Sequence, residues 1–330
     1  MTHPDARDGG VDHLTSEDIV RLEPDAVVVL DQRRLPDEEV ELRCASAAEV
    51  ADAIRTLAVR GAPAIGIAGA YGLALAAARG EDLDAAYEVL ASSRPTAVNL
   101  RWALDELRDD PTAERARALH HEEVDRCRLM ARHAVALVSP RARLLTHCNT
   151  GGLATGGYGS ALGAIRAAWD AGRVEHVWVD ETRPLLQGAR LTAWELERLG
   201  IPFSVVVDGA AAALMASAEV DAVLTGADRI ASNGDVANKV GTYGLAVAAA
   251  HHGIPFYAVA PTSTLDPGAA TGADIPIEER DGHEVSTRFP ARNPAFDVTP
   301  AALVTAIVTE AGVHRAPYAS SLPTPVRAPS

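Results

Sequence analysis

The stretch that decides the fold spans residues 143–152 and reads RLLTHCNTGG. Here the helical pattern of the first half gives way to short apolar strands, the first at Leu144 and Leu145, that alternate with helices. Further strands are expected at 176–179, 203–207, 222–224 and 256–259, with helices at about 160–171, 188–199, 209–217 and 240–251. This alternation predicts βαβ units, and therefore an α/β fold with a parallel sheet and right-handed crossovers.

The residues before 143 follow another pattern. Strands at 27–30 and 40–43 flank a charged turn and predict a small antiparallel sheet. Ser46 and Glu49 form a capping-box pattern that begins a helix over 46–58, and more helices are expected at 64–78, 96–107 and 113–138. Pro63 suits the start of the second helix, whose glycines at 66, 69 and 72 leave one side open to close packing. The first half is therefore expected to be mostly helical.

Composition and charge exclude several classes of partner. The 330 residues are 48% hydrophobic with a formal net charge of -15, so the chain can bury a core but would repel nucleic acid and anionic lipid. No segment is apolar enough for a membrane span, and no leader is readable at the start, so we expect a cytoplasmic protein. The three cysteines lie far apart without a C-x-x-C pattern, which argues against disulfides and zinc.

We expect four segments along the chain. Polar tails are predicted at 1–17 and 318–330, an N-terminal domain at 18–138 and a C-terminal domain at 139–317.

Polar residues cluster where the predicted strands end. Ligands of open α/β sheets bind beyond the carboxyl ends of the strands, where this chain has polar residues at 148–150, 180–183, 208 and 228–229. Cys148 and Asp228 are therefore expected at one edge of the sheet. This pair indicates acid/base chemistry on a small anionic substrate.

Each of these residues also has a structural interpretation. A lone buried cysteine is usually an inert small hydrophobe, and an Asp after a strand is often a helix cap or a ribose ligand. The downstream turn at 233–235 favours a loop after Asp228. His147 suggests a metal site with Cys148, Asp180 and Asp208, but His147 and Cys148 are neighbours on an extended strand and point to opposite faces, so we expect no metal. The glycine-rich stretch 151–157 lacks G-x-G-x-x-G, so we also expect no nicotinamide cofactor.

Several longer segments together resemble one family. They are 59–66 (VRGAPAIG), 93–100 (SRPTAVNL), 146–159, 180–194, 226–244, 260–264 (APTST) and 293–297 (NPAFD), within a match that covers roughly 26–316. The chain resembles the methylthioribose-1-phosphate isomerase family of methionine salvage. The superfamily also holds ribose-1,5-bisphosphate isomerases and regulatory subunits of a translation-initiation exchange factor.

The resemblance implies a two-domain homodimer with a Rossmann-like C-terminal domain and a cofactor-free aldose-to-ketose isomerisation of a sugar phosphate. It carries over Asp228 as proton donor and Cys148 as base or transition-state stabiliser. It also implies seven substrate contacts, at Arg60, Gly61, Ala62, Arg94, Gln187, Asn238 and Lys239. A turn before a helix N-terminus, as at Arg60 to Ala62, offers amides to a phosphate, and Arg94 can bind the same anion.

Two alternatives stay open. The substrate could be a related sugar phosphate, 5-deoxyribose 1-phosphate or ribose 1,5-bisphosphate. The chain could also be a non-catalytic regulatory subunit that senses sugar phosphates or nucleotides, although such a subunit has no evident use for both Cys148 and Asp228.

Overall fold

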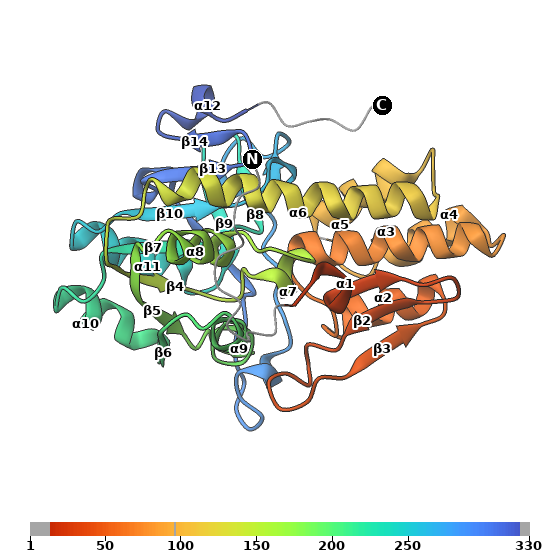
Figure 1. Ribbon diagram of the computed structural model, residues 1–330, viewed down its shortest axis with the longest axis horizontal. Coiled ribbons are helices and arrows are strands. Elements are labelled where there is room, and N and C mark those ends of the chain that lie inside the picture. Colours follow the sequence, from red (N-terminus) through yellow and green to blue (C-terminus); the bar gives the residue numbers. More distant parts are fainter. Residues whose placement is uncertain (1–13, 96, 324–330) are drawn as a thin grey trace, which may run out of the picture.

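The computed structural model describes residues 14–95 and 97–323 (Figure 1). A small antiparallel sheet comes first, in the order β1-β2-β3, formed by Val20–Leu22, Val27–Leu30 and Glu41–Cys44 after the one-turn helix α1, Ser16–Ile19. Five helices follow, namely α2 (Ala47–Arg55), α3 (Ala62–Ala78), α4 (Leu83–Ala91), α5 (Val98–Leu107) and α6 (Ala113–Val135). The predicted small sheet and helical first half are confirmed, and α4 is an additional helix.

The helix α3 is the centre of this first part. It is buried on nearly all sides, and its glycines allow the close packing that the sequence predicts. A Cβ at Gly66 would lie 2.8 Å from the carbonyl oxygen of Asn99, and one at Gly69 would lie 2.5 Å from a methyl carbon of Leu100. The backbone of α5 therefore lies directly against α3 because those positions carry no side chain.

A seven-stranded sheet forms the second part. Its order is β14-β13-β10-β7-β4-β5-β6, and every neighbouring pair is parallel except β13 and β14. The strands are β4 (Ala142–Thr146), β5 (Val174–Asp180), β6 (Phe203–Val206), β7 (Ala222–Thr225), β10 (Phe256–Val259), β13 (Ala306–Thr309) and β14 (Gly312–His314). The predicted parallel sheet is confirmed, with an antiparallel strand at one edge.

The chain order reverses at the centre of this sheet. From β4 it runs outward to β5 and β6 on one side, whereas β7, β10 and β13 follow one another on the other side. The carboxyl ends of β4 and β7 therefore flank the topological switch point, the place where open α/β sheets bind ligands. Cys148 follows β4 and Asp228 follows β7.

Short helices cover the faces and loops of this sheet. They are α7 (Gly152–Thr155), α8 (Ala161–Asp170), the π-helix η1 (Gly188–Thr192), α9 (Ala193–Arg198), η2 (Asp208–Ala210), α10 (Ala211–Ala216), α11 (Thr242–His251), η3 (Thr262–Thr264), η4 (Gly272–Asp274), η5 (Gly282–Glu284), η6 (Ala301–Leu303) and α12 (Tyr318–Ser321). Within the described residues, no helix combines the length and apolar character that a membrane span requires.

The structure also contains a four-stranded sheet that the sequence did not predict. Its order is β11-β8-β9-β12, formed by Leu265–Asp266, Arg229–Ala231, Val236–Lys239 and Phe296–Thr299. The residue after Asp228 begins β8, so Asp228 introduces a β-hairpin rather than the open loop that the sequence favours. The turn that the sequence indicates at 233–235 lies in the connection between the two strands of this hairpin.

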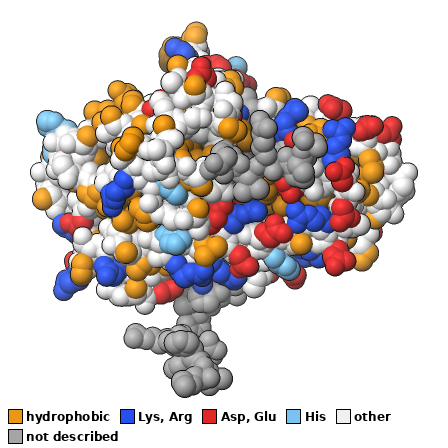
Figure 2. Space-filling model, turned by 90° about the horizontal axis from the view of Figure 1, so that it is seen from above, with side chains coloured by type: hydrophobic (Ala, Val, Ile, Leu, Met, Phe, Trp, Pro, Cys, Tyr) orange, Lys and Arg blue, Asp and Glu red, His pale blue; other side chains and the backbone are white. Residues whose placement is uncertain are grey.

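The long helix α6 spans both parts of the molecule (Figure 1). Cys127, Met130 and Ala134 from its second half belong to the apolar core beside the seven-stranded sheet. On its outer face, Arg126 and Arg128 pair with acidic residues one turn earlier. Figure 2 shows basic and acidic side chains interspersed on this side of the molecule. The domain boundary expected between residues 138 and 139 stays a prediction.

The predicted tails need correction where the structure describes them. Residues 1–13 and 324–330 lie outside the described residues. Ser16 and Glu17, however, begin α1, and Ile19 at its end is fully buried. Tyr318 is buried, and its hydroxyl donates to the carbonyl oxygen of Val304 at 2.7 Å. The ordered chain therefore extends beyond both predicted boundaries, because single large apolar side chains anchor short segments that look polar in sequence.

Candidate active site

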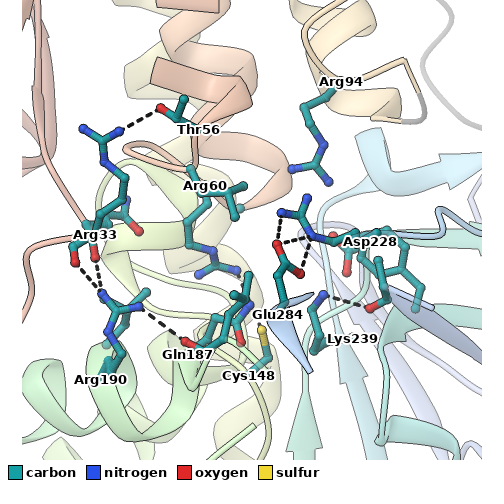
Figure 3. Close-up of a pocket in the computed structure, with 18 of the residues that line it drawn as sticks. Arg33, Thr56, Arg60, Arg94, Cys148, Gln187, Arg190, Asp228, Lys239 and Glu284 are labelled. Atoms are coloured by element: carbon teal, nitrogen blue, oxygen red, sulfur yellow. Dashed lines mark hydrogen bonds and ion pairs between the residues drawn. The ribbon is translucent and has the colours of Figure 1, made fainter. Parts of the chain in front are cut away.

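A cavity of about 350 Å³ lies at the switch point of the large sheet, between the two parts of the molecule (Figure 3). Among the predicted site residues, it brings together Arg60, Gly61, Arg94, Cys148, Gln187, Asp228 and Lys239. A smaller cavity beside it shares Gly61, Arg94 and Asp228 and includes Ala62. Residues far apart in the sequence thus converge on one site of the size that small molecules occupy.

Cys148 faces this cavity because its backbone turns sharply after β4. Its φ is 63°, a left-handed conformation that is uncommon for a residue with a side chain. The turn is held on both sides, since the Cys148 amide donates to Oγ1 of Thr182 at 2.8 Å and its carbonyl accepts from Oγ1 of Thr192 at 2.7 Å. The thiol is therefore fixed in place by main-chain hydrogen bonds, as expected for a positioned reactive group.

Arg60 extends over the thiol from the loop between α2 and α3 (Figure 3). Its Nη1 donates to Oδ1 of Asn149 at 2.7 Å, and its Nη2 lies 3.8 Å from Sγ of Cys148. The next residue, Gly61, has a φ of 98°, and a Cβ there would lie 2.4 Å from the carbonyl oxygen of Ala154. Glycine is thus required where the first part approaches the second, and Arg60 supplies a cation beside Cys148.

Asp228 and Lys239 form the opposite wall of the cavity (Figure 3). Burial raises the pKa of Asp228, although the cations of Lys239, Arg60 and Arg94 oppose the rise. Burial also lowers the pKa of Lys239, whose Nζ donates to the carbonyl oxygen of Ala295 at 2.8 Å. Both shifts favour the neutral form of each group. A carboxyl group whose environment favours protonation has the property required of a general acid.

Two further predicted contacts have unused hydrogen-bonding atoms. Gln187 lines the cavity just before η1, and its Oε1 is buried without a hydrogen-bond partner. Arg94 forms an ion pair with Glu278, with Nη2 and Oε2 2.9 Å apart, but its Nε is buried without a partner. Buried polar atoms without partners are rare, so these two are positioned to bind a ligand.

Asn238 departs from the prediction. It is buried, but it does not line the cavity, and its Nδ2 donates to Oγ1 of Thr242 at 3.0 Å. Side chains alternate along β9, so Asn238 turns away from the wall that Lys239 forms. Its assignment as a substrate contact stays a prediction that this geometry does not support.

The structure adds residues to the cavity that the sequence did not indicate. They are Gln32, Arg33, Arg55, Thr56, Leu57, Leu185, Arg190, Leu191, Arg280, Glu284, Ala295 and Phe296. Arg190 donates to four carbonyl oxygens, of Leu185, Gln32, Arg33 and Leu35, and so ties the turn after β2 to η1. No signal in the sequence pointed to Arg190, which lies inside a predicted helix.

His147 lies behind Cys148 rather than beside it in the cavity. Its Nδ1 lies 3.0 Å from Oδ2 of Asp180, and its Nε2 lies 2.9 Å from the carbonyl oxygen of Val240. Asp208 is also close, and one donor atom from each of the three side chains lies within 4.8 Å of the others. Both carboxylate oxygens of Asp208 accept main-chain hydrogen bonds, from Thr182 and Arg183. His147 thus turns away from the cavity that Cys148 lines, as expected, and it is hydrogen-bonded to Asp180, whereas Asp208 is held by main-chain amides.

The π-helix η1 depends on one glycine. A Cβ on Gly188 would lie 1.7 Å from the carbonyl oxygen of Asp180. We therefore expect Gly188→Ala to lower the free energy of unfolding by about 2 kcal/mol, the scale of an overpacked core. Urea unfolding would measure this change. Gly209→Ala is the control, because a Cβ there meets no atom within 4 Å. Equal stability of the two variants would contradict the close approach at Gly188.

Comparison with known proteins identifies the family to which this chain belongs. The model of the initiation factor 2 subunit family matches residues 58–316, most of the chain. The chain belongs to the initiation factor 2 subunit family. The resemblance seen in the sequence, to the methylthioribose-1-phosphate isomerases of this superfamily, is confirmed by individual members.

Three members are especially similar to this chain. The methylthioribose-1-phosphate isomerase of Anaeromyxobacter dehalogenans is 57% identical over 317 residues, which cover 90% of this chain and 93% of that protein. The crystal structure of 5-methylthioribose 1-phosphate isomerase from Pyrococcus horikoshii OT3 superimposes with a TM-score of 0.83 at 39% identity, covering 94% and 97% of the two chains. A structure named translation initiation factor eIF-2B, subunit delta, from A. fulgidus has a TM-score of 0.78 at 40% identity, covering 92% and 97%.

Proposed function

We propose that this chain is an isomerase that converts S-methyl-5-thioribose 1-phosphate to S-methyl-5-thioribulose 1-phosphate in L-methionine salvage. The observation that carries the proposal is the placement of Cys148 and Asp228 in one cavity at the switch point of the sheet. The name methylthioribose-1-phosphate isomerase on relatives that are 50 to 57% identical over most of this chain supports it.

The substrate explains why an acid is needed. The anomeric oxygen of a sugar 1-phosphate is esterified, so the ring cannot open to a free aldehyde without help. Asp228, whose protonated form burial favours, donates its proton to the ring oxygen as the ring opens. Arg60, Gly61 and Arg94 lie where they can hold the phosphate, with Ala62 beside them.

Cys148 then acts in one of two ways. As a base, its thiolate removes the proton from C2 and returns it to C1, which leaves a carbonyl at C2. Alternatively, the thiol lines a dry site in which the hydrogen of C2 moves to C1 as a hydride. Neither route needs an external oxidant, because C2 is oxidised and C1 is reduced in the same molecule. We therefore propose a reaction without metal or organic cofactor.

The lining of the cavity favours the methylthio sugar over a bisphosphate. Leu57, Leu185 and Leu191 offer an apolar wall that suits a methylthio group. The nearby Arg33 is occupied, because it pairs with Asp31 at 2.6 Å. The guanidinium group of Arg190 already donates hydrogen bonds to main-chain carbonyl oxygens. A second phosphate would therefore have to break existing contacts.

We also propose a cytoplasmic homodimer that binds neither nucleic acid nor membranes. The three cysteines are unpaired and buried, which suits a reducing compartment. Light scattering on the purified protein tests the dimer.

The deciding experiment compares methylthioribose 1-phosphate, 5-deoxyribose 1-phosphate and ribose 1,5-bisphosphate in one assay, after dialysis of the protein against a chelator. We expect turnover of the methylthio sugar to be undiminished by dialysis and to exceed that of the bisphosphate by about 100-fold, since Arg33, Arg55, Arg190 and Arg280, which line the described cavity, all have partners that a second phosphate would have to displace. Preference for the bisphosphate would identify a different isomerase. No turnover of any of the three would favour the regulatory role, which the name of the A. fulgidus relative suggests.

A further inference from the structure

We propose that His147 and Asp180 form a neutral, proton-sharing pair that positions Cys148 and Lys239 across the floor of the cavity. Neither side chain lines the cavity. Both are therefore positioning residues, which act through the two groups that do.

The pair joins three strand ends. His147 follows β4 and directly precedes Cys148, and Asp180 is the last residue of β5. The third partner, the carbonyl of Val240, directly follows Lys239 at the end of β9. One buried ring thus connects the turn that carries the thiol to the strand that carries the amine. Any shift of this ring would move both.

The surroundings leave the ring little freedom. Both His147 and Asp180 are only 1% exposed. A Cβ on Gly241 would lie 2.8 Å from Cε1 of His147, so only a glycine lets the chain pass the ring. Thr182 adds a second link, because its Oγ1 donates to the carbonyl of Asp180 and accepts from the amide of Cys148. Asp180 is therefore coupled to Cys148 by two routes.

The hydrogen bonds fix where the protons lie. A carbonyl oxygen can only accept, so Nε2 of His147 must carry a hydrogen to bind Val240. The 3.0 Å contact between Nδ1 and Oδ2 of Asp180 then requires one more proton, on either the nitrogen or the oxygen. In both cases the pair as a whole has no net charge.

The charges around the pair place that proton on Asp180. Oδ1 of Asp180 is buried without a partner, which is costly for an ionised carboxylate. Burial raises the pKa of Asp180, His147 opposes the rise, and Asp208 and Glu181 add to it. On the other side of His147 lies Asp297, and burial raises the pKa of this carboxyl group too, so its neutral form is favoured there. We infer that Asp180 is a carboxylic acid that donates to Nδ1 of a neutral imidazole.

A neutral pair and a charged pair predict different activities for the Asp180→Asn variant. An asparagine amide can donate to Nδ1 as a carboxylic acid does, so Asp180→Asn should keep kcat within about 3-fold of the parent. Asp180→Ala and His147→Gln each break the link, and we expect kcat to fall on the order of 100-fold, the scale for misplaced reacting groups. KM should change much less. A pair of imidazolium and carboxylate would instead make Asp180→Asn as damaging as Asp180→Ala, and that result would overturn the proposal.

Two controls separate positioning from loss of folding. His176→Gln changes a different histidine, in β5, which packs on Trp178 and does not line the cavity, and it should leave kcat unchanged. Thermal unfolding of every variant identifies any that fail to fold.

A second measurement does not depend on the proposed isomerase activity. In ¹⁵N NMR of the resting protein, the resonances of His147, assigned by their absence in His147→Gln, should report a neutral ring protonated on Nε2. A doubly protonated ring would overturn the inference even if the enzyme isomerises its sugar. Conversely, a neutral ring in a protein without isomerase activity would support the pair and reject only the proposed function.

Discussion

Asp228→Asn should lower turnover by about 100-fold or more, the usual scale for a lost general acid. Asparagine keeps the size of the side chain, but its amide does not release a proton to a ring oxygen. Arg60 and Arg94 stay in place to bind the phosphate, so KM should change little. Steady-state kinetics on methylthioribose 1-phosphate would measure both constants. Near-normal turnover would remove Asp228 from the mechanism.

The same variant should be at least as stable as the parent at neutral pH. Burial raises the pKa of Asp228 in the folded protein above its value of 3.8 in the unfolded chain. The folded state then binds more protons than the unfolded state between the two values, so Asp228 costs stability as pH rises through that window. Asparagine removes this cost. An unchanged or higher melting temperature would show that the loss of turnover is chemical.

The pH profile provides an independent check. If protonated Asp228 is the acid, kcat/KM of the parent should decline as pH rises through the raised pKa of this group. The residual activity of Asp228→Asn should lack that decline.

The sequence predicts the large sheet well because its central strands are continuous apolar runs. The strands β7 and β10 are buried along their whole length, and β4, β5, β7 and β10 all lie within two residues of their predicted bounds. The sheet of β8, β9, β11 and β12 was missed for a physical reason. Its strands are two to four residues long, and β12 joins β9 across a long irregular segment. Such pairing is set by tertiary contacts rather than by local periodicity.

The candidate site, like the fold, could be predicted from the sequence only in part. Cys148 and Asp228 could be placed at one sheet edge from the strand pattern, because parallel strands present their carboxyl ends together. The approach of Arg60 and Arg94 from the other half of the chain was implied only by resemblance. Arg280 and Glu284 were not foreseen, because the segment that carries them has no regular pattern; the charged run at 278–280 was its only signal. The contact between His147 and Val240 depends on the unpredicted hairpin.

Cys148→Ser should be nearly inactive, with turnover reduced by about 1,000-fold, if the thiolate is the base, because a serine hydroxyl ionises far less readily than a thiol. Serine is close to cysteine in size, and the main-chain bonds to Thr182 and Thr192 that hold the left-handed turn do not involve the thiol. The geometry of the site should therefore survive, and the change isolates the chemistry of one atom.

Turnover in heavy water distinguishes the two routes. A proton that passes through Cys148 can exchange with solvent, so product formed in D₂O should carry deuterium at C1. A hydride that moves directly from C2 to C1 never leaves the substrate, and the product should carry no solvent label. We expect some deuterium at C1, with Cys148 as the base, since Cys148 lines the cavity and Nη2 of Arg60 lies 3.8 Å from its Sγ.

The two measurements together assign the role of Cys148. Label at C1 with an inactive serine variant identifies the thiolate as the base that carries the proton. Unlabelled product with an inactive variant indicates a hydride shift in a site that still needs the thiol, for example to exclude water beside Arg60. Unlabelled product from an enzyme whose Cys148→Ser variant keeps most of its activity would show that the cysteine only packs, and the strained turn that presents it to the cavity would then serve some other residue.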